Sequence, residues 1–78
     1  MKFNQDVIDE INVLLQFDLS NSQQGIKIHH TAEPTAIAAA ERLHNKGLVD
    51  HSDGGYLTAL GRTAAEHAQA MYSALSVG

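Results

Sequence analysis

One predicted helix, residues 34–46, carries side chains of the kinds that proteins use to contact DNA bases. An arginine can form two hydrogen bonds with a guanine edge and an asparagine can do so with an adenine edge, and Arg42 and Asn45 supply these groups. Thr35 and Ala38 share the same predicted face and carry methyl groups that suit the thymine methyl. These four residues are candidate base contacts. An ordinary solvated helix face explains the same pattern, and that alternative stays open here.

Three further cations are candidates for contacts with DNA phosphates. Such contacts fix the position of a protein on DNA without reading its sequence. Lys46 ends the same predicted helix, Lys27 precedes it and Arg62 follows it. Each cation taken alone is equally typical of a protein that binds no nucleic acid, so these three assignments depend on the fold.

Other kinds of chemistry have little support in the sequence. Five histidines are present, but His29 and His30 are adjacent on a predicted strand and would point to opposite faces. The chain has no metal-ligand spacing such as His-Glu-x-x-His, no nucleophile elbow and no glycine loop that would hold phosphate. We therefore expect no metal, no cofactor and no enzymatic activity.

The charge of the chain argues against strong nucleic-acid binding. The formal net charge is −4 and the pI is near 5.6, whereas affinity for phosphate comes mainly from lysine and arginine. Residues 1–18 contain one lysine and four acids, while residues 27–62 contain four cations and four acids. Any DNA-binding face is expected within residues 27–62, and it should be weak.

Length and composition predict one small domain over residues 1–78, with a thin core. Hydrophobic residues make up 44% of the chain, but many are alanine and only 5% are aromatic. The absence of cysteine excludes disulfides. No apolar run approaches the roughly 18 residues of a membrane span, so we expect no membrane partner and a cytoplasmic location.

Apolar spacing and turn residues predict the elements that would position these side chains. Residues 4–17 form an amphipathic helix capped by Asn4. Residues 18–25 are polar, and residues 26–29 alternate as in a short strand. The helix over 34–46 starts with Pro34 and is capped by either Thr31 or Glu33. Its predicted buried face is formed by Ala36, Ile37, Ala40 and Leu43.

A glycine stop and a hairpin follow that helix. Gly47 suits the left-handed residue that ends many helices. Leu48-Val49 and Tyr56-Leu57 are predicted strands, joined by a turn at residues 52–55 that contains two glycines. Thr58 caps a last helix at about 59–75, in which Gly61 implies close contact with another element. The predicted apolar face of this helix consists of Leu60, Ala64, Ala68, Met71 and Leu75.

Two segments resemble winged-helix regulators of the MarR type. The run from Glu41 to Val49 is similar to the R-L-x-x-K-G-L-V sequence that ends their recognition helix, and the run from Tyr56 to Arg62 is similar to the L-T-x-x-G-R sequence after their wing. The chain as a whole also resembles a family of short gammaproteobacterial proteins that are sometimes labelled DNA-binding. The resemblance implies an α+β, winged-helix-like fold with three main helices, a small antiparallel wing hairpin and a third short strand contributed by residues 26–29.

The resemblance implies a DNA-binding, transcription-associated protein that places helix 34–46 in the major groove and strands 48–57 as a wing. Three features depart from the regulators. Residues 18–30 lack the apolar spacing of the helix that precedes a recognition helix. The wing turn carries Asp53 and no cation, and the exposed helix face is poor in cations. These departures support the alternative of a protein-interaction or dimerisation module without DNA binding.

The last helix is the candidate surface for a homodimer. In the resembling regulators the terminal helices build the dimer. Met71, Tyr72 and Leu75 extend beyond the region that the wing can cover, and methionine and tyrosine are enriched in interface cores. Packing of this helix on the first helix within one monomer is the alternative.

Overall fold

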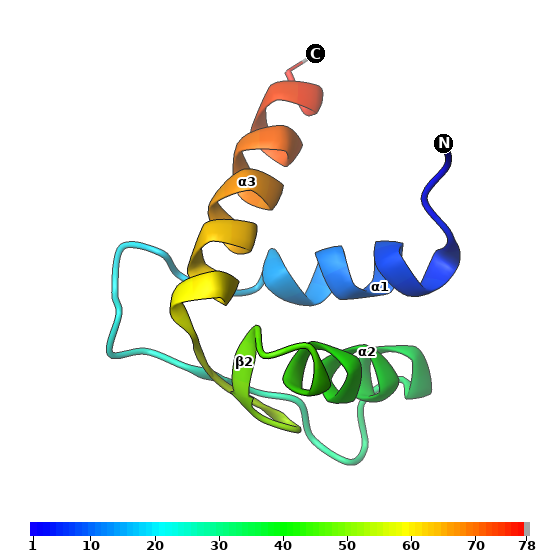
Figure 1. Cartoon of the computed structure of the whole chain (residues 1–78), viewed down its shortest axis with the longest axis vertical. Coiled ribbons are helices and arrows are strands. Elements are labelled where there is room, and N and C mark those ends of the chain that lie inside the picture. The colour runs from blue at the N-terminus through cyan, green and yellow to red at the C-terminus, as the bar shows by residue number, and fades with distance from the viewer. Residues whose placement is uncertain (78) are drawn as a thin grey trace.

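Three helices and a small sheet make up the fold (Figure 1). The computed structural model describes residues 1–77. The elements, in chain order, are α1 (Gln5–Leu14), β1 (Ile26–Lys27), α2 (Pro34–Asn45), β2 (Val49–His51), β3 (Gly54–Leu57) and α3 (Ala59–Leu75). The strands form one antiparallel sheet in the order β1-β3-β2. This is the predicted α+β class, and it is compatible with a winged-helix-like description.

Helix α1 begins as predicted but ends early. The Asn4 side chain accepts a hydrogen bond from the backbone N–H of Val7 at 2.9 Å, which confirms the N-cap. The helix ends at Leu14, three residues before the predicted end. Nε2 of Gln69 on α3 donates hydrogen bonds to the carbonyls of Leu14 (3.3 Å) and Phe17 (2.8 Å). This side chain satisfies carbonyls at the helix end, while Phe17 is buried in the core.

Helix α2 has the predicted start and stop. It begins at Pro34 after Glu33, whose side chain makes no capping hydrogen bond. Gly47 has a φ of 80°, and its N–H bonds the carbonyl of His44 at 3.0 Å. The N–H of Leu48 reaches the carbonyl of Leu43 at 2.9 Å, which completes the helix-ending motif that favours glycine at this position.

The hairpin is tighter than predicted. The strands reach His51 and Gly54, so only Ser52 and Asp53 form the turn. Gly54 and Gly55 have positive φ but belong to β3, and the β2–β3 register shifts between Val49 and His51. Residues 26–27 pair with β3, which confirms the predicted third strand, although it is shorter than residues 26–29.

One close contact joins the start of α3 to the start of the hairpin. The Thr58 hydroxyl accepts a hydrogen bond from the N–H of Gly61 at 3.0 Å and donates one to the carbonyl of Gly47 at 2.6 Å. A Cβ atom on Gly61 would lie 1.8 Å from the carbonyl oxygen of Leu48. Thr58 is therefore the N-cap of α3, as predicted. Glycine is required at position 61 by a close approach to another element, which was also predicted.

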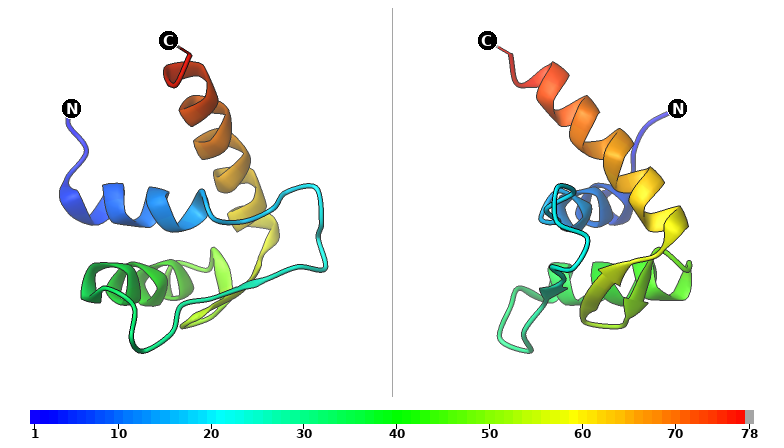
Figure 2. Two further views of the ribbon diagram at one scale, coloured as in Figure 1. Left: turned by 180° about the vertical axis from the view of Figure 1, so that it is seen from behind. Right: turned by 90° about the vertical axis from the view of Figure 1, so that its left-hand side faces the viewer.

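The core lies where α1, α2, α3 and β2 meet. Its buried residues are Val13, Leu14, Phe17, Ala39, Leu43, Val49, Ala65 and Ala68. On α3 the buried line is Gly61, Ala65 and Ala68, so the chain itself buries only part of the predicted apolar face. Leu60 is exposed in the first turn of α3. Met71 and Leu75 are exposed because the second half of α3 extends away from α1 and the sheet, as Figures 1 and 2 show.

The Gly61 contact gives a testable prediction. Gly61→Ala should destabilise the protein by about 2 kcal/mol or more, because the added methyl group meets backbone that cannot move aside. Alanine's higher helix propensity, worth about 1 kcal/mol, should not offset this loss. Gly47→Ala is the matched control, because nothing lies within 4 Å of its Cβ position and it adds only the strain of the positive φ. Urea unfolding followed by circular dichroism would measure both. A Gly61→Ala protein as stable as the wild type would contradict the close contact.

Candidate interaction surfaces

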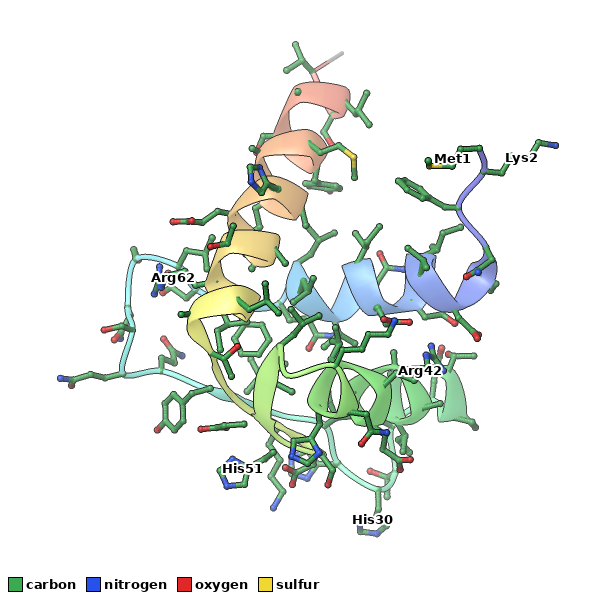
Figure 3. The ribbon with its side chains drawn as sticks, in the orientation of Figure 1. Met1, Lys2, His30, Arg42, His51 and Arg62 are labelled. Carbon is green, nitrogen blue, oxygen red and sulfur yellow. The ribbon has the colours of Figure 1, made fainter. Side chains whose placement is uncertain are left out.

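A buried carboxylate joins α1 to α2. Glu10 is only 6% exposed. Its Oε2 accepts a hydrogen bond from Nε of Arg42 at 2.9 Å, and its Oε1 accepts one from Nζ of Lys46. Arg42 also donates to the backbone carbonyl of Asp6 at 3.2 Å and lies 3.8 Å from the Asp6 carboxylate. Figure 3 shows Arg42 beside α1.

The surroundings of Glu10 favour its charged form. Burial alone raises the pKa of this carboxyl, but the hydrogen bonds from Lys46 and Arg42, together with their charges, outweigh burial and lower the pKa below its usual range. The hydrogen bond that Arg42 donates to Glu10 likewise raises the pKa of Arg42. The three side chains therefore hold α1 and α2 together as ions.

This cluster changes the predicted faces of α2. Arg42 was placed on the solvent-facing side with Thr35, Ala38 and Asn45, but it turns toward α1 because Glu10 binds it, and only 29% of its side chain is exposed. Thr35 and Asn45 are exposed and Ala38 is half-buried. Glu41 is exposed as well, but it borders a groove beside the hairpin turn, whereas Thr35 borders a groove beside α1. The structure therefore does not bring the four candidate base contacts together on one exposed face.

The candidate phosphate contacts are dispersed. Lys46 binds Glu10, as described above. Nη1 of Arg62 donates to the backbone carbonyl of Leu19 at 3.2 Å, which attaches α3 to the loop after α1. Lys27 is exposed on β1.

The hairpin carries two acids, Asp50 on β2 and Asp53 in the turn. Oδ1 of Asp50 accepts a hydrogen bond from the N–H of Tyr56 at 2.8 Å and lies 2.6 Å from Nδ1 of His51. The hydrogen bond from the Tyr56 N–H has the largest effect on Asp50, and together with the contact to His51 it lowers the pKa of Asp50. Asp53 is exposed and borders a groove of about 310 Å³, together with Lys27 and Glu41. The charges around this groove are mixed, so it does not form a basic surface.

In contrast to the groove with mixed charges, the groove between α1 and α3 is apolar. Its volume is about 320 Å³, and it is lined by Ile11, Leu14, Ala64, His67, Ala68 and Met71. Beyond it Tyr72, Leu75 and Val77 are 59%, 78% and 83% exposed. Met71, Tyr72 and Leu75 are the residues that the sequence singled out for a dimer. The sequence analysis did not single out Val77. The absence of lysine, arginine, aspartate and glutamate from residues 67–77 is the signal that could have identified it.

No metal site or membrane-spanning segment is found in the described residues. Across residues 1–77, histidines and acids do not gather in a group of three or more that could hold a metal ion. In the same range no helix is both long and apolar enough to cross a membrane.

The fold and these surfaces define a small α+β domain in which a helix, a glycine stop and a hairpin follow one another as in winged-helix proteins. The chain belongs to a family of unknown function (DUF5669), whose model matches residues 1–76. No curated protein and no solved structure matches the chain.

The Glu10 cluster predicts how stability depends on pH. Glu10→Gln should destabilise the protein by about 2 kcal/mol at neutral pH, because Arg42 and Lys46 lose their shared partner. Since the pKa of Glu10 is lowered in the folded state, its contribution is complete above the unfolded pKa of about 4.5 and is lost as pH falls through the folded value. The difference in unfolding free energy between wild type and Glu10→Gln should therefore shrink below about pH 4.5.

Asp9→Asn is the matched control, since it removes the same charge from the neighbouring position of α1. It should change stability much less, because Asp9 hydrogen-bonds only Gln5 of its own helix, at 2.9 Å. Equal losses for Asp9→Asn and Glu10→Gln would contradict a specific role for the buried carboxylate.

Proposed function

We propose that this protein is a protein-interaction module built on a winged-helix-like frame. The observation that carries the proposal is the contrast between two surfaces. The cations of α2 are bound to the carboxylates of α1, whereas the apolar groove between α1 and α3 and the end of α3 are open. An exposed apolar surface that continues a core stripe is typical of a protein-binding face.

Electrostatics support the same proposal. Affinity for DNA depends on cations that replace the counterions of the phosphates. The exposed side of α2 carries Glu41, and the hairpin turn carries Asp53. A duplex that approached this face would meet these acids, while Arg42 and Lys46 are already paired with Glu10.

The thin core gives an energetic reason for a protein partner. Ten hydrophobic residues are buried, and four of them are alanines. An alanine contributes little apolar area, and small domains are marginally stable in any case. Covering the end of α3 would add the burial of larger side chains, each worth about 1.5–3 kcal/mol when fully buried.

DNA binding in a transcription-associated role is the second candidate. It is favoured by the order of α2, the Gly47 stop and the hairpin, which matches the order of recognition helix and wing in the MarR-like regulators. Thr35, Ala38 and Asn45 would face the bases. Arg42 would join them only by exchanging Glu10 for DNA, and Lys27, Lys46 and Arg62 would contact phosphates.

A capture experiment with a nuclease arm tests the first candidate. The immobilised protein should retain a protein partner from a cell lysate after nuclease treatment. Leu75→Asp should abolish retention, because it places a charge in the apolar face. Leu60→Asp should preserve it, because Leu60 is also exposed on α3 but lies at the other end of the helix. A partner that disappears with the nucleic acid would count against the proposal.

An NMR titration tests the second candidate. The labelled protein would be mixed with duplex DNA of mixed sequence at about 50 mM salt, where phosphate contacts are strong. We expect no shift changes in residues 35–46. Saturable changes confined to those residues and the hairpin, and weakened by added salt, would establish the DNA-binding candidate instead.

A further inference from the structure

We propose that the groove between α1 and α3 is filled by α3 of a second copy of this chain, with the two α3 helices antiparallel and crossing near Met71. This inference rests on the proposed protein-interaction function and names its partner. It follows from the spacing, size, charge and area of the exposed side chains.

Spacing is the first argument. Ala64, Ala68, Met71 and Leu75 follow at intervals of four, three and four residues, which is the repeat of helices that pack side by side. Helix α1 covers this line only around Ala68, which is 7% exposed. At Leu75 nothing in residues 1–77 covers it, as the separation of the upper half of α3 from α1 in Figures 1 and 2 illustrates.

Size is the second argument, and it sets the direction of the pair. The line begins with two alanines and ends with methionine and leucine, so it is narrow at one end and bulky at the other. A two-fold axis near Met71 places Leu75 of one copy beside His67 and Ala68 of the other, and the reverse contact is made at the same time. A parallel pair would set bulky residues against bulky ones and leave the alanines apart.

Charge is the third argument, and it favours a second copy over a partner of opposite charge. Residues 67–77 contain no lysine, arginine, aspartate or glutamate. Each copy carries a net charge of −4, and residues 1–18, with one lysine and four of the nine acids, account for most of it. Contact through the uncharged end of α3 lets two acidic copies meet with the least repulsion, whereas a basic partner would find no carboxylate on this segment to recognise.

The exposed area is at the lower end of the range that stable dimers bury. Met71, Tyr72, Leu75 and Val77 keep between 38% and 83% of their surface exposed. With the groove, these side chains offer on the order of 600 Å² per copy, which approaches the roughly 800 Å² that each partner contributes to a standard stable interface.

Light scattering coupled to gel filtration tests the dimer across a wide range of concentrations. The wild type should have the mass of two chains. Leu75→Asp should raise the dimer dissociation constant at least roughly 30-fold, as expected for an anchor residue worth about 2 kcal/mol. The control Leu60→Asp should leave the dissociation constant within about threefold of the wild-type value, because a lone exposed residue outside the interface contributes little. A wild type that stays monomeric at every concentration would overturn the inference.

Single-cysteine variants test the direction of the pair without disturbing its charge, because the chain has no cysteine of its own. His67→Cys and Leu75→Cys, mixed and oxidised, should form the mixed disulfide faster than either forms its own dimer. Met71→Cys should dimerise by itself. Disulfides of Leu75→Cys with itself as the dominant product would overturn the antiparallel pair.

The light-scattering and capture experiments together separate this inference from the proposed function. A monomeric wild type that still retains a protein partner through Leu75 overturns the second copy but leaves the interaction module intact. A monomeric wild type that retains no protein and binds DNA overturns both.

Discussion

The Glu10 carboxylate sets the orientation of α2, and much of what the surface can do depends on that orientation. It is buried between α1 and α2 and engages both α2 cations at once. A buried carboxylate is costly to desolvate unless it is paired, so α2 cannot rotate about its axis without leaving this charge unsatisfied. Arg42 therefore turns toward α1, while Lys46 is paired with Glu10 but keeps 52% of its side chain exposed.

The residues that resemble the MarR-like motifs are used here for packing. Gly47 ends α2, the carbonyl of Leu48 approaches Gly61, and the Thr58 hydroxyl links Gly47 to the N–H of Gly61. These contacts fix the hairpin between two helices without involving any outside molecule. A sequence similarity confined to such residues indicates the frame of a winged helix, because the frame requires them whether or not the exposed faces bind DNA.

Local features of the fold could be predicted from sequence, while contacts between distant segments could not. The Asn4 and Thr58 caps, the Gly47 stop and the pairing of residues 26–27 with the hairpin depend on neighbouring residues or on short-range geometry. The inward turn of Arg42 depends on an acid 32 positions earlier in the chain. Helical periodicity placed Arg42 opposite Leu43 on the wheel, but it carried no information about the helix that would pack there.

The apolar face of α3 shows the same limit in a different way. Periodicity placed Ala64, Ala68, Met71 and Leu75 on one apolar face, but it did not show which part of that face the chain itself buries, and only Ala68 of these four is buried. The reason is the direction of the helices, because α1 runs across α3 and meets only part of its length, as Figures 1 and 2 show.

The α1–α2 contact and the exposed end of α3 differ in their chemistry, and this difference affects how the domain could bind another molecule. The α1–α2 contact includes ion pairs that are satisfied within one chain, so a second molecule gains little by competing for them. The exposed end of α3 is apolar and uncharged, so water is released when any matching surface covers it. The net negative charge lies mainly in residues 1–18, which contain one lysine and four acids. The end of α3 is thus an exposed surface whose burial is not opposed by charge.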